Sequence, residues 1–159
     1  MSKTYKTYLP IKNLKPSKRS RYQQGYINPL SCKKLFESQR STPIIYRSSY
    51  EKLFIQWLER SSKVLRWGSE CVRINYVNAN DGKQHSYYPD YLVETTDGVY
   101  LIEVKPYNQT VQPPVDTPRD GYAWTTYITN ISKWKYAQDY CDNNGLKFKI
   151  LTEKTIHKL

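Results

Sequence analysis

Cysteine and long apolar runs are both scarce in this sequence of 159 residues. Cys32, Cys71 and Cys141 are odd in number, lie far apart and form no CxxC or Cys/His cluster, which argues against both a disulfide framework and a zinc site. No apolar run approaches the ~20 residues of a membrane helix, and no apolar signal segment is visible near the N-terminus. We therefore expect one cytosolic domain with reduced thiols and no membrane partner.

Acidic residues are almost absent from residues 1–47, which hold eleven Lys or Arg and one acid, Glu37. Eleven minus one gives this segment +10 of the net charge of +11. Basic side chains neutralise phosphates, and the interleaved tyrosines can stack on bases. The pattern predicts an extended arm that binds a polyanion, with a short helix near residues 31–39, although a solvated tail would look the same. The candidate DNA contacts are Lys12, Lys15, Lys18, Arg19, Arg21 and Arg47.

The remainder, residues 48–159, has the periodicity of a folded domain. Ser48-x-x-Glu51 matches a capping box at the start of a helix over residues 49–60. Alternating patterns predict strands over residues 71–77, 85–95 and 99–105, and Pro89 marks an edge position, a bulge or a late start in the second of them. A helix over residues 131–144 and a strand over residues 146–151 complete the order αβββαβ. Between them lies a Pro-rich connection, residues 106–129, whose end at 123–128 could pair as a short strand.

Residues 87–106, YYPDYLVETTDGVYLIEVKP, form a predicted hairpin with charge on one face. If Asp97-Gly98 is the turn, partner numbers sum to 195 and Asp90 lies opposite Lys105. Because side chains alternate along a strand, Asp90, Glu103 and Lys105 then share a face, and the neighbouring Val104 points to the other face. A register slip of one residue would break this arrangement, and a slip of two would keep it.

Two carboxylates about 7 Å apart on one face are hard oxygen ligands that suit Mg²⁺. Such an ion polarises a phosphodiester and lowers the pKa of a water molecule, and a lysine beside it can orient that water or stabilise charge on phosphorus. Simpler roles are also open for each residue. Asp90 and Lys105 could form a cross-strand ion pair worth under about 1 kcal/mol, and Glu51 could serve the helix cap only.

Three blocks of the sequence, YRSSYE, YYPDYLVE and LIEVKPYNQT, lie in this order on the predicted helix and hairpin. Together they resemble the signature of the PD-(D/E)xK nuclease superfamily. More narrowly, they resemble the head-completion nucleases of T4-like tailed phages and the endonuclease subunits of Tn7-type transposases. The resemblance implies an α/β, restriction-endonuclease-like core, a mixed central sheet flanked by helices, at residues 48–159 behind the basic arm.

The resemblance also implies roles for individual residues. Asp90 and Glu103 would be metal ligands with the backbone carbonyl of Val104, and Lys105 would be the catalytic lysine. Glu51 would bind a second metal ion or orient a water. The cofactor would be Mg²⁺, with Mn²⁺ as a substitute.

The biological setting implied is cleavage of double-stranded DNA during phage head completion, after packaging. Portal or neck proteins would be partners, and the protein would act in the host cytoplasm or in the virion head and neck. Two alternatives stay open from the sequence. One is a structural plug of the virion that keeps a nuclease fold without needing catalysis, and the other is a transposase-type endonuclease subunit.

Overall fold

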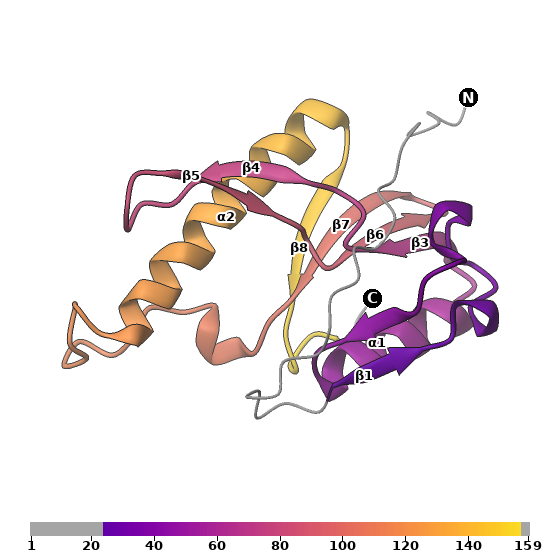
Figure 1. Cartoon of the computed structure of the whole chain (residues 1–159), viewed down its shortest axis with the longest axis horizontal. Helices are drawn as coiled ribbons and strands as arrows, with labels where there is room; N and C mark the ends of the chain where they lie inside the picture. Colours follow the sequence, from indigo (N-terminus) through magenta and orange to yellow (C-terminus); the bar gives the residue numbers. More distant parts are fainter. Residues whose placement is uncertain (1–23, 157–159) are drawn as a thin grey trace.

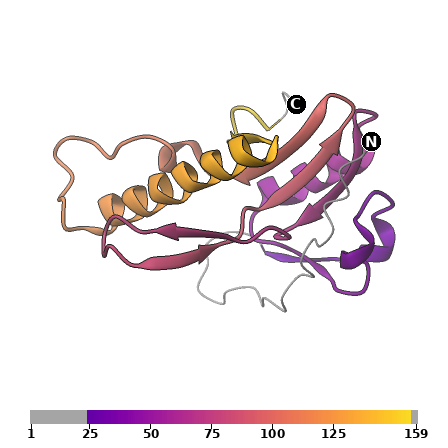
Figure 2. The ribbon, with the colours of Figure 1, turned by 90° about the horizontal axis from the view of Figure 1, so that it is seen from above.

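A mixed sheet of four strands lies at the centre of the computed structural model, which describes residues 24–156. Its strands, in spatial order, are β3 (Val64–Ser69), β6 (Tyr91–Thr95), β7 (Gly98–Val104) and β8 (Lys147–Leu151). Strand β6 runs antiparallel to both of its neighbours, β3 and β7, and β8 runs parallel to β7. Figures 1 and 2 show that one helix covers each face of this sheet, so the α/β prediction with a restriction-endonuclease-like core is confirmed.

The first helix, α1 (Ser49–Arg60), begins and ends where the capping and apolar pattern predicted. The Ser48 hydroxyl accepts a hydrogen bond from the Glu51 backbone N–H at 3.2 Å, which satisfies one of the free donors of the first turn. Phe54 and Leu58 are buried and pack with Tyr91 of β6 and Ile102 of β7. This burial fixes α1 against one face of the sheet.

The second helix, α2 (Tyr122–Asn144), covers the opposite face. Trp134 and Ala137 pack there against Leu92 of β6 and Leu101 of β7. Gly145, with φ of 68°, adopts the left-handed conformation that ends a helix, as predicted. The helix starts nine residues before the predicted position at 131, so the suggested strand at 123–128 is wrong.

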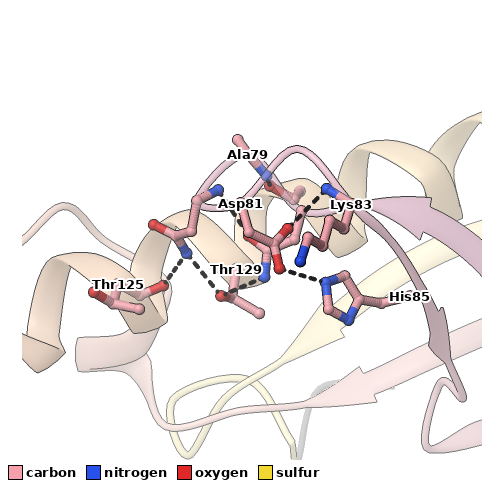
Figure 3. A network of polar contacts seen from close by, with 9 residues as sticks. Ala79, Asp81, Lys83, His85, Thr125 and Thr129 are labelled. Carbon is pink, nitrogen blue, oxygen red and sulfur yellow. Dashed lines mark hydrogen bonds and ion pairs between the residues drawn. The ribbon is translucent and has the colours of Figure 1, made fainter.

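A separate two-stranded ribbon explains the early start of α2. The ribbon consists of β4 (Ile74–Val77) and β5 (Gln84–Tyr87) and lies along α2 in both views. Its turn is bonded to the first half of the helix: Asn80 Nδ2 donates to the Thr125 carbonyl at 2.9 Å and to Thr129 Oγ1 at 3.0 Å (Figure 3). Tertiary contacts of this kind override the strand propensity of the Thr- and Tyr-rich segment.

Two strand predictions need correction. The first strand of the central sheet is β3, not residues 71–77, which contribute β4 of the ribbon. The predicted strand 85–95 is two strands in different sheets, β5 and β6, separated at Pro89, where a missing N–H favours a break. Exposed residues and a register shift between Val64 and Arg66 interrupt the alternation of β3. The helix–three strands–helix–strand order nevertheless holds for the central sheet.

The register of the β6–β7 hairpin also differs from the prediction. Thr95 pairs with Gly98 and Tyr91 with Ile102, so partner numbers sum to 193 rather than 195. The two turn residues are thus Thr96-Asp97 rather than Asp97-Gly98, and the Thr95 hydroxyl donates across the turn to the Gly98 carbonyl at 2.8 Å. The difference is a shift of two residues, which keeps every side chain on its predicted face. Continued by one residue, this register places Asp90 opposite Glu103 rather than opposite Lys105.

The part of the predicted arm that the structure describes is folded. β1 (Gly25–Ile27) pairs with β2 (Ile44–Tyr46), and two short 3₁₀ turns, Pro29–Ser31 and Glu37–Gln39, replace the expected helix. Leu35 and Ile44 are buried in the core beside α1. The expectation of an extended segment is therefore wrong for residues 24–47. Lys12, Lys15, Lys18, Arg19 and Arg21 lie outside the described residues.

No helix among residues 24–156 is long and apolar enough to cross a membrane. A third 3₁₀ turn, Tyr107–Gln109, directly follows β7 and Pro106 and begins the long connection to α2. The turn lies beside the candidate site, whose lining includes Gln109.

Candidate active site

A small pocket opens where β7 ends and α1 begins. Its volume is about 160 Å³, and its lining includes Glu51, Asp90, Val104 and Lys105. Glu103 does not line this pocket and is only 3% exposed. Three of the four predicted side chains thus share one cavity, and the fourth lies buried next to it on β7.

Asp90 is held by backbone groups on both sides. Its Oδ2 accepts a hydrogen bond from the Val104 N–H at 2.7 Å, and its carbonyl accepts one from the Glu70 N–H at 2.9 Å. Burial raises the pKa of Asp90 well above its ordinary value, and the nearby charges of Glu103 and Glu51 raise it further. The positive charge of Lys105 acts in the opposite direction without cancelling these effects.

Glu103 is fixed by a hydrogen bond from the ribbon. The Tyr87 hydroxyl donates to Glu103 Oε2 at 2.6 Å, and Lys105 Nζ lies 3.5 Å from Oε1. Burial alone lowers the pKa of Lys105, but the charges of Glu103 and Asp90 outweigh burial and raise it above the ordinary value. Lys105 therefore keeps its ammonium form beside the two acids.

Glu51 combines the cap with a place in the pocket. Its Oε2 accepts a hydrogen bond from the Arg47 N–H at 3.0 Å, and the Tyr91 hydroxyl lies 3.4 Å from Oε1. Burial raises the pKa of Glu51 to about 7, because it outweighs the opposing effect of Arg47. Glu51 can thus stabilise the start of α1 and line the pocket at the same time.

Two basic residues outside the four predicted site positions are placed as follows. Arg47 lines the pocket, and its guanidinium forms an ion pair with Glu70 at 3.4 Å. Its proposed contact with DNA stays a prediction. His85 is paired with Asp81 at 2.8 Å near the turn of the ribbon (Figure 3), and it does not line the pocket.

Two charged residues near the site were not found from the sequence. Glu70 follows β3 with a φ of 48°, and burial, together with the charge of Glu103, raises its pKa. Lys133 of α2 places Nζ 5.4 Å from the centre of the Tyr87 ring, and burial, followed by the charge of Lys105, lowers its pKa. No local sequence motif marks Glu70 or Lys133, because tertiary packing brings both residues to the site.

The acids fit a hard divalent cation. Within residues 24–156, no three His, Cys, Asp or Glu side chains are gathered closely enough to form a metal cluster by themselves. The oxygen donors available near the pocket are the carboxylates of Asp90, which lines it, and of Glu103, which is buried on β7 beside Val104. Because burial and mutual repulsion raise the pKa of Asp90 and Glu51, a bound cation would stabilise their charged forms. Oxygen donors of this kind favour Mg²⁺ over softer metals.

A mixed sheet covered by a helix on each face, with acids and a lysine at the open end of the β6–β7 hairpin, away from its turn, defines the class of restriction-endonuclease-like proteins of the PD-(D/E)xK type. Residues 61–153 match the model of the TnsA-like endonuclease N-terminal domain, and the chain belongs to this family. It is also 35% identical over 128 residues to the head completion nuclease of Enterobacteria phage T4. The matched region covers 73% of this chain and 83% of that relative. The roles of the individual site residues stay predictions.

Proposed function

We propose that this chain is a Mg²⁺-dependent DNA nuclease that processes DNA ends during phage head completion, after packaging. The observation that supports this proposal best is the convergence of Asp90, Glu51 and Lys105 on one pocket, with Glu103 hydrogen-bonded directly behind it. Structural acids in a sheet would be solvated or fully paired. Here burial and like charges raise the pKa of Asp90 and Glu51, which is typical of functional sites.

Asp90 and Glu103 would hold the cation, with the carbonyl of Val104, and Glu51 would hold a second ion or a water. The ion, when bound, supplies a Lewis acid that polarises the phosphodiester and lowers the pKa of a water molecule. The protein contributes the fixed positions of its ligands. Val104 N–H and Tyr87 O–H each orient one carboxylate, so the oxygens do not have to be reorganised when substrate binds.

Lys105 and Glu51 would assist the reaction from two sides of the pocket. The Lys105 ammonium can donate hydrogen bonds to a phosphate oxygen and stabilise the charge that develops on it. Glu51, with a pKa of about 7, can accept a proton at a carboxylate oxygen near neutral pH. Hydrolysis would break the bond between phosphorus and the 3′ oxygen, leaving a 5′-phosphate and a 3′-hydroxyl.

The setting in phage head completion is inferred from the T4 relative, which shares 35% identity over most of both chains. On this basis the substrate is double-stranded phage DNA, and portal or neck proteins are the expected partners. The basic residues ahead of the described part, from Lys12 to Arg21, would hold the DNA backbone. Residues 48–159 would form the nuclease domain.

Cleavage of linear and supercoiled DNA tests the assigned site. Asp90→Asn, Glu103→Gln and Lys105→Met should each lower the cleavage rate with Mg²⁺ by about 100-fold or more. Asp139→Asn, an exposed acid on α2, is the matched control and should cleave at the normal rate. EDTA should abolish the activity, and Mg²⁺ or Mn²⁺ should restore it. Equal cleavage by the control and by Asp90→Asn would refute the assignment.

Complementation separates this function from a purely structural one. A phage carrying Glu103→Gln or Lys105→Met should produce filled heads that do not become infectious. Infectious particles from both variants would instead support a structural plug that needs the fold without catalysis. A chain that cuts DNA only with a second subunit would support the transposase-type alternative that its family membership suggests.

A further inference from the structure

A second, larger pocket lies next to the candidate active site. It has a volume of about 430 Å³ and is formed by the loop after β7 and the first turns of α2. Its walls are mostly apolar and aromatic, with Pro113, Pro114, Tyr122 and Tyr127, and two amide side chains, Asn108 and Gln109, supply polar groups. The size is within the range of about 300–1,000 Å³ that is typical of small-molecule sites.

The two pockets adjoin each other at one residue. Gln109 lines both of them, and it lies four residues after Lys105 at the end of the Tyr107–Gln109 turn. A DNA strand with a phosphate at Lys105 would therefore pass close to the second pocket.

The surface around this pocket exposes large apolar side chains that a merely structural loop would bury. Tyr122 is 86% exposed and Val115 is fully exposed, while Tyr107 and Val111 are each 40% exposed. Cations stack on aromatic rings of the same region: the Arg119 guanidinium lies 3.9 Å from the centre of the Trp124 ring, and Lys154 Nζ lies 3.5 Å from that of Tyr107. These two rings do not line the pocket, and each has one face covered by its cation. The aromatic surfaces open to an unpaired base are those of Tyr122 and Tyr127, which do line it.

We propose that this pocket, lined by Tyr122 and Tyr127, binds an unpaired nucleobase of the DNA strand whose phosphate occupies the active site. The proposal rests on the nuclease function proposed above and specifies its substrate. A paired base is stacked on both sides and bonded along its edge, so it cannot enter, whereas an unpaired base can stack on a tyrosine and use the amides of Asn108 and Gln109. The preferred substrate would then be DNA with a single-stranded segment at the cleavage site.

The acidic residues of the loop do not place negative charge in the pocket where the nucleobase would bind. Asp116 and Asp120 are exposed, and neither lines the pocket. A protein partner is the competing occupant, and it would not require a pocket that adjoins the active site.

Binding measured without cleavage tests the proposal. In the Asp90→Asn background, the affinity for a duplex with a short overhang is compared with that for a blunt duplex of the same sequence, and 2-aminopurine in the overhang reports stacking. We expect tighter binding of the overhang and quenching of its fluorescence. Adding Tyr122→Ala should weaken overhang binding by on the order of tenfold, with blunt binding unchanged. Adding Tyr122→Trp should keep it.

The matched control is Tyr26→Ala, which removes a half-exposed tyrosine on β1 outside this pocket and should change neither affinity. Equal affinities for the two duplexes, or equal losses with Tyr26→Ala and Tyr122→Ala, would overturn the proposal and leave the surface to a protein partner. Cleavage by the chain with an intact Asp90 is measured separately. Active enzyme without overhang preference would refute only the pocket, while inactive enzyme would refute the proposed function.

Discussion

At the scale of single residues, the position of Glu103 depends on one hydrogen bond. Tyr87→Phe removes the hydroxyl that donates to Glu103 Oε2 at 2.6 Å, while the ring stays in the core. Groups that orient metal ligands typically contribute about 10- to 100-fold to metal affinity. We therefore expect Mn²⁺ binding, measured by calorimetry, to weaken by about that factor, with a parallel fall in cleavage at subsaturating metal.

Tyr100→Phe is a suitable control for this effect. Tyr100 lies on the same strand, β7, and packs beside the α1 side of the core, away from Glu103. Its variant should bind Mn²⁺ normally. If Tyr87→Phe and Tyr100→Phe bound the ion with equal affinity, the Tyr87 hydroxyl would have no role in positioning the ligand.

The raised pKa of Glu51 predicts that the stability of the metal-free protein depends on pH. Its pKa rises from 4.5 in the unfolded chain to about 7 in the fold, so the folded state binds more protons between these values. The free energy of unfolding should then fall as pH rises from about 4.5 to 7, by about 3 kcal/mol at most. Glu51→Gln removes this titration and keeps an oxygen that can accept the Arg47 N–H.

Chemical denaturation in EDTA checks this expectation. Glu51→Gln should be more stable than the unmodified chain at pH 8, and the two should be nearly equal at pH 4.5. Glu37→Gln, whose carboxylate is 90% exposed, should show no such difference. A stability gain for Glu51→Gln that did not change with pH would contradict the assigned pKa.

The sequence predicts the residues of the candidate site better than it predicts their surroundings. Asp90, Glu103 and Lys105 fall on one face because side chains alternate along a strand, and this local rule survives a register shift of two. Glu70 and Lys133 could not be predicted in the same way. Each reaches the site from a distant segment, after β3 or on α2, and the periodicity of the sequence does not predict contacts between distant segments.

At the scale of secondary-structure elements, prediction succeeded where local chemistry and packing agree. Helix α1 combines a capping serine with an apolar stripe, and its bounds match the prediction. The β3 strand was missed because two consecutive residues, Leu65 and Arg66, are both exposed in the fold. Its sequence therefore does not alternate between apolar and polar residues. The start of α2 was missed because Thr125 and Thr129 favour a strand locally, whereas their bonds to Asn80 of the ribbon turn stabilise the helix through tertiary structure.

The ribbon also links the core to the candidate site. Its tip is bonded to α2 through Asn80, and its last residue, Tyr87, contacts Glu103. The Ser132 hydroxyl on α2 accepts a further bond from the Ala79 N–H at 3.1 Å. An insertion between the first two strands of the central sheet thus orients a proposed metal ligand, which explains why a polar turn packs so closely on a helix.

At the scale of the whole molecule, the charge of +11 lies mainly in residues 1–47, of which only 24–47 are described. Folding of residues 24–47 was not predictable from composition, because a few apolar positions such as Leu35 and Ile44 supply the buried contacts among many charges. The basic residues ahead of Gln24 keep their proposed role as contacts to the DNA backbone. That role has a measurable signature in the dependence of affinity on salt.

Replacing Lys12, Lys15 and Lys18 with Gln lowers the net charge from +11 to +8. If all three contact phosphates, the slope of log affinity against log salt on duplex DNA should decrease by about 2.7, since each contact contributes roughly 0.9. The control replaces the exposed Lys63, Lys147 and Lys149, which gives the same net charge and should change the slope much less. Equal changes in both variants would show that only total charge matters, and that the segment from Lys12 to Lys18 makes no particular contact with DNA.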